Sequence, residues 1–287
     1  MKNKASYYVP EQSAWPIIGA LALLFLAFGS LNLEQKWGVI AFMIGLVGLV
    51  FMLGGWFWNV TQESNAGLYN QQMDKTFRWG MCWFLVSEFF LFALLIGSII
   101  HVRFSIAPWL AGQSGDASQL THYLIWPDFA KHWPLLKPPS ATTAANTFSL
   151  SSLHQIPLIN LIILIASALF LTTARYQKKS MGHKSCRLSL NLAIFLAFIF
   201  LISQTYYLIQ LINAHIITQS GVYGSFLIAF LGLHSLNSVG ALLLMGIVCF
   251  RIYRNQLLEK NSFSFDATVW WWDFLAAIWL LGFFLVF

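Results

Sequence analysis

The chain has 287 residues, of which 58% are hydrophobic and only 9% are charged, and its mean hydropathy is +0.68. Because a soluble domain carries about 25% charged residues, the composition excludes an ordinary soluble protein and indicates a multi-span membrane protein. The formal net charge of +6 is therefore interpreted through membrane topology and does not indicate a nucleic-acid partner.

Seven apolar runs follow one another along the chain, and each is close to the length that a helix needs to cross about 30 Å of hydrocarbon. They are Trp15–Leu33, Gly38–Trp58, Phe77–Ile100, Ile156–Ala174, Leu188–Ile212, Tyr223–Ile252 and Val269–Phe287. We therefore predict an all-α membrane protein with seven transmembrane helices in a single domain over residues 1–287. A cleaved signal peptide is the alternative for the first run, but the polar, proline-containing segment Tyr7–Pro16 disfavours it.

Basic residues fall unevenly on the two sides that these runs define. With the N-terminus in the cytoplasm, the outer segments hold Lys36, Arg103, Lys131 and Lys137, and the inner segments hold the other 12 of the 16 Lys and Arg residues. Short cytoplasmic segments of membrane proteins are enriched in Lys and Arg. The pattern predicts a cytoplasmic N-terminus and an external C-terminus.

One acid, Glu88, lies in the middle of the third run. A charged side chain there costs at least about 2.5–3.5 kcal/mol on insertion scales, so its first interpretation is functional. His234 lies at a similar depth in the sixth run, and we consider it a possible polar partner of Glu88. The alternatives are a neutral acid that joins neighbouring helices and a histidine that is hydrogen-bonded in the core.

Other polar features have simpler interpretations. Trp270-Trp271-Trp272 is typical of an aromatic belt at the membrane interface, and Asp273 is typical of an acid at a helix start. The long segment Ser105–Gln155 predicts an extended outer loop that folds onto the interface or a partner. Three scattered cysteines and mostly peripheral histidines predict no disulfide framework, and no metal site on this chain.

Several groups of residues carry a resemblance to a known family. In chain order they are Tyr8-Val9-Pro10-Glu11 with Trp15-Pro16, Glu63-Ser64-x-x-Gly67-x-Tyr69, Phe77-Arg78-Trp79-Gly80-Met81 with Ser87-Glu88, Pro157-Leu158-Ile159-Asn160 with Ser167, Val222-Tyr223-Gly224-Ser225 with Gly232-Leu233-His234, and Phe265-Asp266 with Trp270-Trp271-Trp272 and Trp279. Together they resemble subunit III of the haem–copper cytochrome c oxidases, in colinear order over the whole chain.

The resemblance implies a subunit without a redox or catalytic centre in an oxygen-reducing, proton-translocating oxidoreductase complex. Its partners would be subunits I and II, which carry haem A and copper, and it would meet cytochrome c only through the complex. Helices one and two (about 15–58) would be separated from helices three to seven (about 77–287) by a phospholipid-filled cleft. Glu88 would be the carbodiimide-reactive carboxyl of the family. The candidates for binding lipid are Trp58, Glu63, Arg78 and Arg254.

The same resemblance implies a role in supporting subunit I, through oxygen access, proton uptake and stability during turnover. We expect the chain in a bacterial cytoplasmic membrane. Several polar residues of the family are replaced in the later helices, by Arg175-Tyr176, Tyr207, Asn237, Asp273 and Ala276. These departures keep a diverged assembly or structural paralogue as an alternative, and a proton-coupled transporter using Glu88 and His234 as a weaker one.

Overall fold

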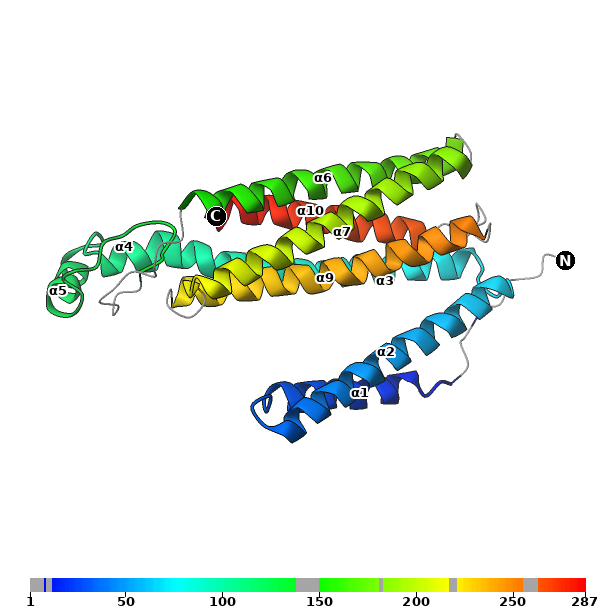
Figure 1. The fold of residues 1–287 in the computed structure, drawn as a ribbon, viewed down its shortest axis with the longest axis horizontal. Coiled ribbons are helices and arrows are strands. Elements are labelled where there is room, and N and C mark those ends of the chain that lie inside the picture. The colour runs from blue at the N-terminus through cyan, green and yellow to red at the C-terminus, as the bar shows by residue number, and fades with distance from the viewer. Residues whose placement is uncertain (1–7, 9–11, 138–149, 181–182, 217–220, 255–262) are drawn as a thin grey trace. The chain divides into compact units, whose positions relative to one another are not determined.

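The computed structural model describes Tyr8 and residues 12–137, 150–180, 183–216, 221–254 and 263–287. The chain divides into two compact units, Met1–Trp79 and Gly80–Phe287, and each is described by itself (Figure 1). Among the described residues the regular structure is entirely helical.

In the first unit, α1 (Trp15–Ser30) and α2 (Lys36–Asn65) form a helical hairpin. Glycines let the two backbones approach closely. A Cβ atom added to Gly45 would lie 2.5 Å from the Leu26 amide nitrogen and 2.8 Å from the Ala22 carbonyl oxygen. Small residues at such crossings are the usual solution in membranes, where burial of apolar surface does not drive helices together.

The end of α2 turns the chain at Gly67, whose φ is +73°. The Gly67 amide donates to the Ser64 carbonyl at 3.2 Å, and the Leu68 amide donates to the Glu63 carbonyl at 3.2 Å. This pair of hydrogen bonds is a Schellman motif, which needs a left-handed residue at the position of Gly67. The next helix, α3 (Gln71–His101), begins four residues later, and the boundary between the units falls within it.

The second unit contains the rest of α3 and four long helices, α6 (Leu150–Ser180), α7 (His183–Asn213), α9 (Val222–Tyr253) and α10 (Phe263–Leu285). The helix α6 packs on α7, α7 packs on α9, and α10 packs on both α6 and α9, as Figure 1 shows. The side chains of α3 join them through ring contacts, such as Phe92 with Phe230 at 6.0 Å between centroids.

The all-helical, multi-span character of the fold is confirmed. Within the described residues six helices are long and apolar enough to cross a membrane, and the shorter α1 is also apolar. The helices extend past several of the predicted apolar runs, because polar residues at their ends continue the backbone hydrogen bonds beyond the apolar stretch. The separation of two bundles by a lipid-filled cleft and the direction of insertion stay predictions.

Interhelical hydrogen bonds fix the core of the second unit. The indole of Trp272 donates to the Ser167 hydroxyl at 3.1 Å, and that hydroxyl donates to the Ala193 carbonyl at 2.8 Å. The Trp279 indole donates to the Pro157 carbonyl at 3.1 Å, and Gln204 donates to the Ser235 hydroxyl at 2.7 Å. The Gln204 side chain thus joins α7 to α9.

The interpretation of Trp270-Trp271-Trp272 as an interfacial belt does not hold for Trp272. The helix α10 begins at Phe263, so the three tryptophans lie in its second and third turns, and Trp272 is fully buried. Asp273 does not start a helix either. It lies in the interior of α10, where its carboxylate accepts a hydrogen bond from Thr172 at 3.4 Å. Successive residues of a helix point about 100° apart, so the three tryptophans face different neighbours, and Trp272 faces the core.

The predicted outer loop is partly helical. After α3 the chain continues through a π-helical turn (Val102–Ile106), α4 (Ala107–Leu110) and α5 (Asp116–Ile125). Trp133 packs on the unit's own core, with its ring 5.4 Å from that of Tyr223 and 4.9 Å from the Arg103 guanidinium. Residues 138–149 of this segment lie outside the described residues.

Candidate functional site

Glu88 is half-buried on α3, and one of its carboxyl oxygens, Oε2, is buried with no hydrogen-bond partner among the described residues. Aromatic side chains lie one turn away on either side. Phe84 contacts the Trp271 ring at 4.9 Å, and Phe92 contacts the His234 ring at 6.2 Å, centroid to centroid. The carboxyl therefore faces the region between α3, α9 and α10.

Asn237 is the polar group that meets Glu88. Its side chain lies close enough to the Glu88 carboxyl to interact with it electrostatically, and its Nδ2 donates to the Leu233 carbonyl at 3.2 Å. On the other side, the Trp271 indole donates to Asn237 Oδ1 at 3.2 Å. The amide is thus oriented by its neighbours, and the arrangement leaves one oxygen of Glu88 able to hold a proton or to accept a hydrogen bond from a ligand.

His234, the predicted partner of Glu88, lies one turn from Asn237 on α9 and is fully buried. Its Nε2 is 3.0 Å from the Leu275 carbonyl oxygen, which makes Nε2 the protonated ring nitrogen. Nδ1 is 3.4 Å from the Ser238 hydroxyl, and the ring lies 4.9 Å from that of Trp279. These contacts describe a core histidine held by hydrogen bonds and aromatic packing.

Glu63, a candidate for lipid binding, is held by the turn at the end of α2. The Tyr69 hydroxyl donates to Glu63 Oε2 at 2.7 Å, and Phe77 packs edge-on against the Tyr69 ring at 5.1 Å. Burial and the hydrogen bond to Glu63 raise the pKa of Tyr69 above its ordinary value, so the phenol stays a donor at neutral pH. The spacing of Glu63, Gly67 and Tyr69 in the sequence is explained by this geometry.

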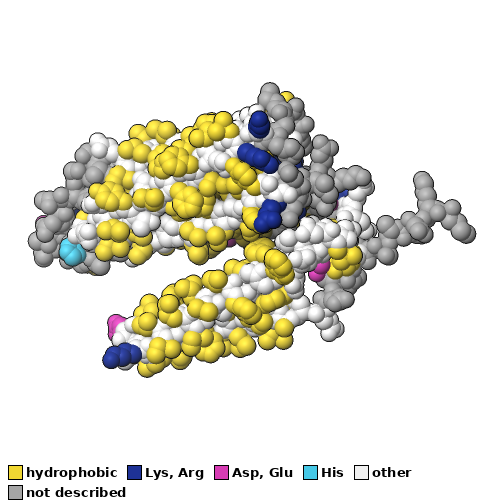
Figure 2. Space-filling view, turned by 45° about the vertical axis from the view of Figure 1, so that its right-hand side comes forward, with side chains coloured by type: hydrophobic (Ala, Val, Ile, Leu, Met, Phe, Trp, Pro, Cys, Tyr) yellow, Lys and Arg dark blue, Asp and Glu magenta, His cyan; other side chains and the backbone are white. Residues whose placement is uncertain are grey.

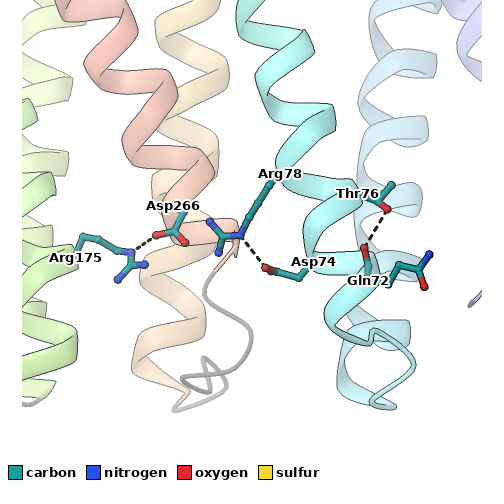
Figure 3. A network of polar contacts seen from close by, with 6 residues as sticks. All are labelled: Gln72, Asp74, Thr76, Arg78, Arg175 and Asp266. Carbon is teal, nitrogen blue, oxygen red and sulfur yellow. Dashed lines mark hydrogen bonds and ion pairs between the residues drawn. The ribbon is translucent and has the colours of Figure 1, made fainter. Parts of the chain in front are cut away.

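The remaining lipid candidates lie at helix surfaces. Trp58 is 65% exposed on α2. Arg78 pairs with Asp74 one turn earlier on α3, with 2.7 Å between Nε and Oδ2 (Figure 3). Arg254 is exposed at the end of α9, with its guanidinium 5.3 Å from the centroid of the Phe250 ring. The first two belong to one unit and Arg254 to the other.

Two members of this site were missed in the sequence. The sequence indicates Asn237 only as a departure from the family pattern, and it predicts Trp271 to lie in an interfacial belt. A polar residue three positions after His234 on the same helix was the available signal, since residues three apart share a helix face. The ion pair between Asp74 and Arg78 was also predictable, because side chains four residues apart on a helix are neighbours. The described residues contain no group of three His, Cys, Asp or Glu side chains that could hold a metal ion.

The fold and the site define a helical, multi-span membrane protein in which the Glu88 carboxyl lies deep within one span. The chain matches the family described as "Cytochrome c oxidase subunit III" over residues 5–114 and 140–287. Because the match covers most of its length, the chain belongs to the cytochrome c oxidase subunit III family. The resemblance drawn from the motifs is confirmed at this level.

Curated relatives agree with the family match. The chain is 25% identical to cytochrome c oxidase subunit 3 of Pisaster ochraceus over 281 residues, which cover 98% of this chain and 96% of the relative. It is 26% identical to the protein of the same name from Tetraodon nigroviridis, over 96% of this chain and 94% of the relative. The identity with the Anopheles gambiae protein is 27%, over 96% and 93% of the two chains.

Proposed function

We propose that this chain is the membrane-embedded, non-catalytic subunit III of a proton-pumping cytochrome c oxidase in aerobic respiration. The single observation that carries the proposal is membership of the family over nearly the whole chain. The chain would bind subunits I and II, and haem A and copper would reside in those partners. Its membrane would be a bacterial cytoplasmic membrane, with the N-terminus inside.

In this proposal Glu88 is a functional, half-buried carboxyl within a membrane span of an accessory subunit. Its contact with Asn237 and the free Oε2 support a local role in holding a proton or a lipid head group. The same proposal assigns phospholipid binding to Trp58, Glu63 and Arg78 of the first unit and to Arg254 of the second. Bound lipid would support oxygen access, proton uptake and stability of subunit I during turnover.

A diverged assembly or structural paralogue is the second candidate. Two of the residues that depart from the family pattern favour this candidate, because their side chains pack in the interior of the chain. Tyr207 is fully buried, and Ala276 packs against the hydrophobic core. Such a protein would fold in the same way and would not reside in a working oxidase.

Co-purification separates these two functions. We expect the chain, tagged and extracted in mild detergent, to bring down a haem-bearing subunit that shows haem absorbance and cytochrome c oxidase activity. Recovery of the chain in a haem-free form, from cells whose membranes contain an active oxidase, would contradict the proposal and favour the paralogue. The measurement is the haem-to-protein ratio of the purified sample.

A second prediction concerns Glu88. Glu88→Gln is expected to leave the haem content of the complex unchanged, to abolish labelling of this chain by a hydrophobic carbodiimide, and to shorten the time for which the oxidase stays active during turnover. The amide keeps the shape and removes the reactive acid. The control is Glu34→Gln, because Glu34 is an exposed acid in the link between α1 and α2. Labelling that persists in Glu88→Gln would show that another acid reacts.

A further inference from the structure

Positive charge is concentrated at one end of the second unit, where α6 and α9 end and α7 and α10 begin. Figure 2 shows Lys and Arg side chains gathered there beside a long apolar surface. Lys178 lies within electrostatic range of Arg175, Arg251 and Asp266. This cluster of four residues, here called the basic cluster, holds three cations and one acid.

The single acid of the basic cluster is already paired. Arg175 contacts Asp266 through its Nε atom, as Figure 3 shows. Arg251 donates from Nη1 to the Ser264 hydroxyl at 3.0 Å, which is a neutral partner. Two positive charges, those of Lys178 and Arg251, are therefore left without a counter-charge within the cluster.

Both of these cations have buried nitrogen atoms that lack a partner. Lys178 Nζ and Arg251 Nε are shielded from solvent, and neither has a hydrogen-bond partner among the described residues. A buried cation is costly unless it is paired and hydrogen-bonded. An anion bound at this end of the unit would balance the charges of Lys178 and Arg251.

An open cavity of about 300 Å³ lies beside the ion pair, between α6 and α10. Its lining consists of Thr172, Arg175, Tyr176, Asp266, Val269 and Trp270. Arg175 is the basic residue of the lining, and Lys178 lies one turn further toward the end of α6. Thr172 is eight residues before Ser180, where α6 ends, so the cavity reaches about 12 Å along the helix from that end.

We propose that this cavity binds an anionic phospholipid, with its phosphate at the basic cluster and an acyl chain along Thr172, Val269 and Trp270. Basic pockets between transmembrane helices are typical sites for anionic head groups. A zwitterionic lipid brings its own cation and leaves the two positive charges uncompensated, whereas an anionic lipid removes at least one of them. The site is separate from Trp58, Glu63, Arg78 and Arg254.

The test is native mass spectrometry of the detergent-purified chain, alone or with its partners, after addition of dioleoyl phosphatidylglycerol or dioleoyl phosphatidylcholine. The unaltered chain should retain phosphatidylglycerol at lower lipid concentration than phosphatidylcholine. Lys178→Met should weaken phosphatidylglycerol binding about fivefold, the equivalent of ~1 kcal/mol for one basic residue at a membrane surface. Lys178→Arg should retain the lipid.

The matched control is Lys184→Met, because Lys184 is an exposed lysine at the same end of the unit, near the start of α7. Equal binding of the two lipids by the unaltered chain would overturn the proposal, and that comparison needs no variant to fold. Weakening by Lys184→Met as large as that by Lys178→Met would also overturn it, as would displacement of the lipid by millimolar inorganic phosphate. The readout is the mass of bound lipid, so it is independent of whether the chain brings down a haem-bearing partner.

Discussion

Arg175→Met is expected to destabilise the second unit by about 3–5 kcal/mol, the usual cost of removing one partner of a buried ion pair. Arg175 and Asp266 join α6 to α10 and are only 15% and 9% exposed. Methionine preserves the apolar stem of arginine but leaves the Asp266 carboxylate buried without its guanidinium. The measurement is the free energy of unfolding in mixed micelles, obtained by titration with a denaturing detergent.

The chain provides a matched control for this substitution. Arg78 and Asp74 form an ion pair of the same residue types, but their side chains are 32% and 35% exposed and lie on one helix; Figure 3 shows both pairs. An exposed pair of this kind contributes at most about 1 kcal/mol, so Arg78→Met should change the free energy of unfolding little. Equal losses in the two variants would contradict the assignment of Arg175–Asp266 as a structural link.

The double variant Arg175→Met/Asp266→Leu distinguishes loss of the attraction from the cost of a buried carboxylate that has lost its hydrogen-bonding guanidinium. Replacing a buried ion pair by apolar residues of similar volume is often neutral or stabilising. We therefore expect the double variant to regain most of the stability lost in Arg175→Met. If it does not, the ion pair contributes through an attraction that apolar packing cannot replace.

The sequence was sufficient for the number of apolar helices and for the family, because both depend on long stretches of the chain. Each apolar run lies largely within a helix, since a membrane span must satisfy its own backbone hydrogen bonds. The helix ends were less predictable. The helix α10 begins at Phe263, six residues before the predicted start at Val269, and Trp272, which was expected at the interface, is buried in the core.

The composition of the candidate site was only half predictable. Glu88 is conspicuous by itself, because an acid inside an apolar run is expensive. Its contact with Asn237 depends on how α3 and α9 are rotated about their axes, and that rotation is set by packing between helices far apart in the sequence. His234 lies on the same helix as Asn237, three residues earlier. Both residues therefore have a similar depth in the membrane, and depth alone does not predict which of them contacts Glu88.

Residues that differ from the family pattern are therefore informative about the interior of this chain. Asn237 accepts a hydrogen bond from the Trp271 indole and meets the Glu88 carboxyl. The amide of Asn237 provides two donors and an acceptor at this position. Asn237 therefore gives the acid a polar neighbour whose own charge does not change near neutral pH.

The second large effect is expected in the first unit, where Gly45→Ala should destabilise the α1–α2 hairpin by about 1–3 kcal/mol, as overpacking of a close contact usually does. The added Cβ would lie 2.5 Å and 2.8 Å from backbone atoms of Leu26 and Ala22. Backbone atoms cannot move aside by a change of rotamer, so the two helices would have to separate. Unfolding of the purified chain in mixed micelles measures the loss.

Gly54→Ala is the control, and it should shift stability in the opposite direction. Gly54 lies on the same helix, but nothing is within 4 Å of a Cβ added there. Alanine favours the helical backbone over glycine by about 0.5–1 kcal/mol, so this variant should be as stable as the unaltered chain or more so. Opposite signs at two glycines nine residues apart would show that close approach of α1 and α2, and not helix propensity, requires Gly45. A loss at Gly54 equal to that at Gly45 would exclude this explanation.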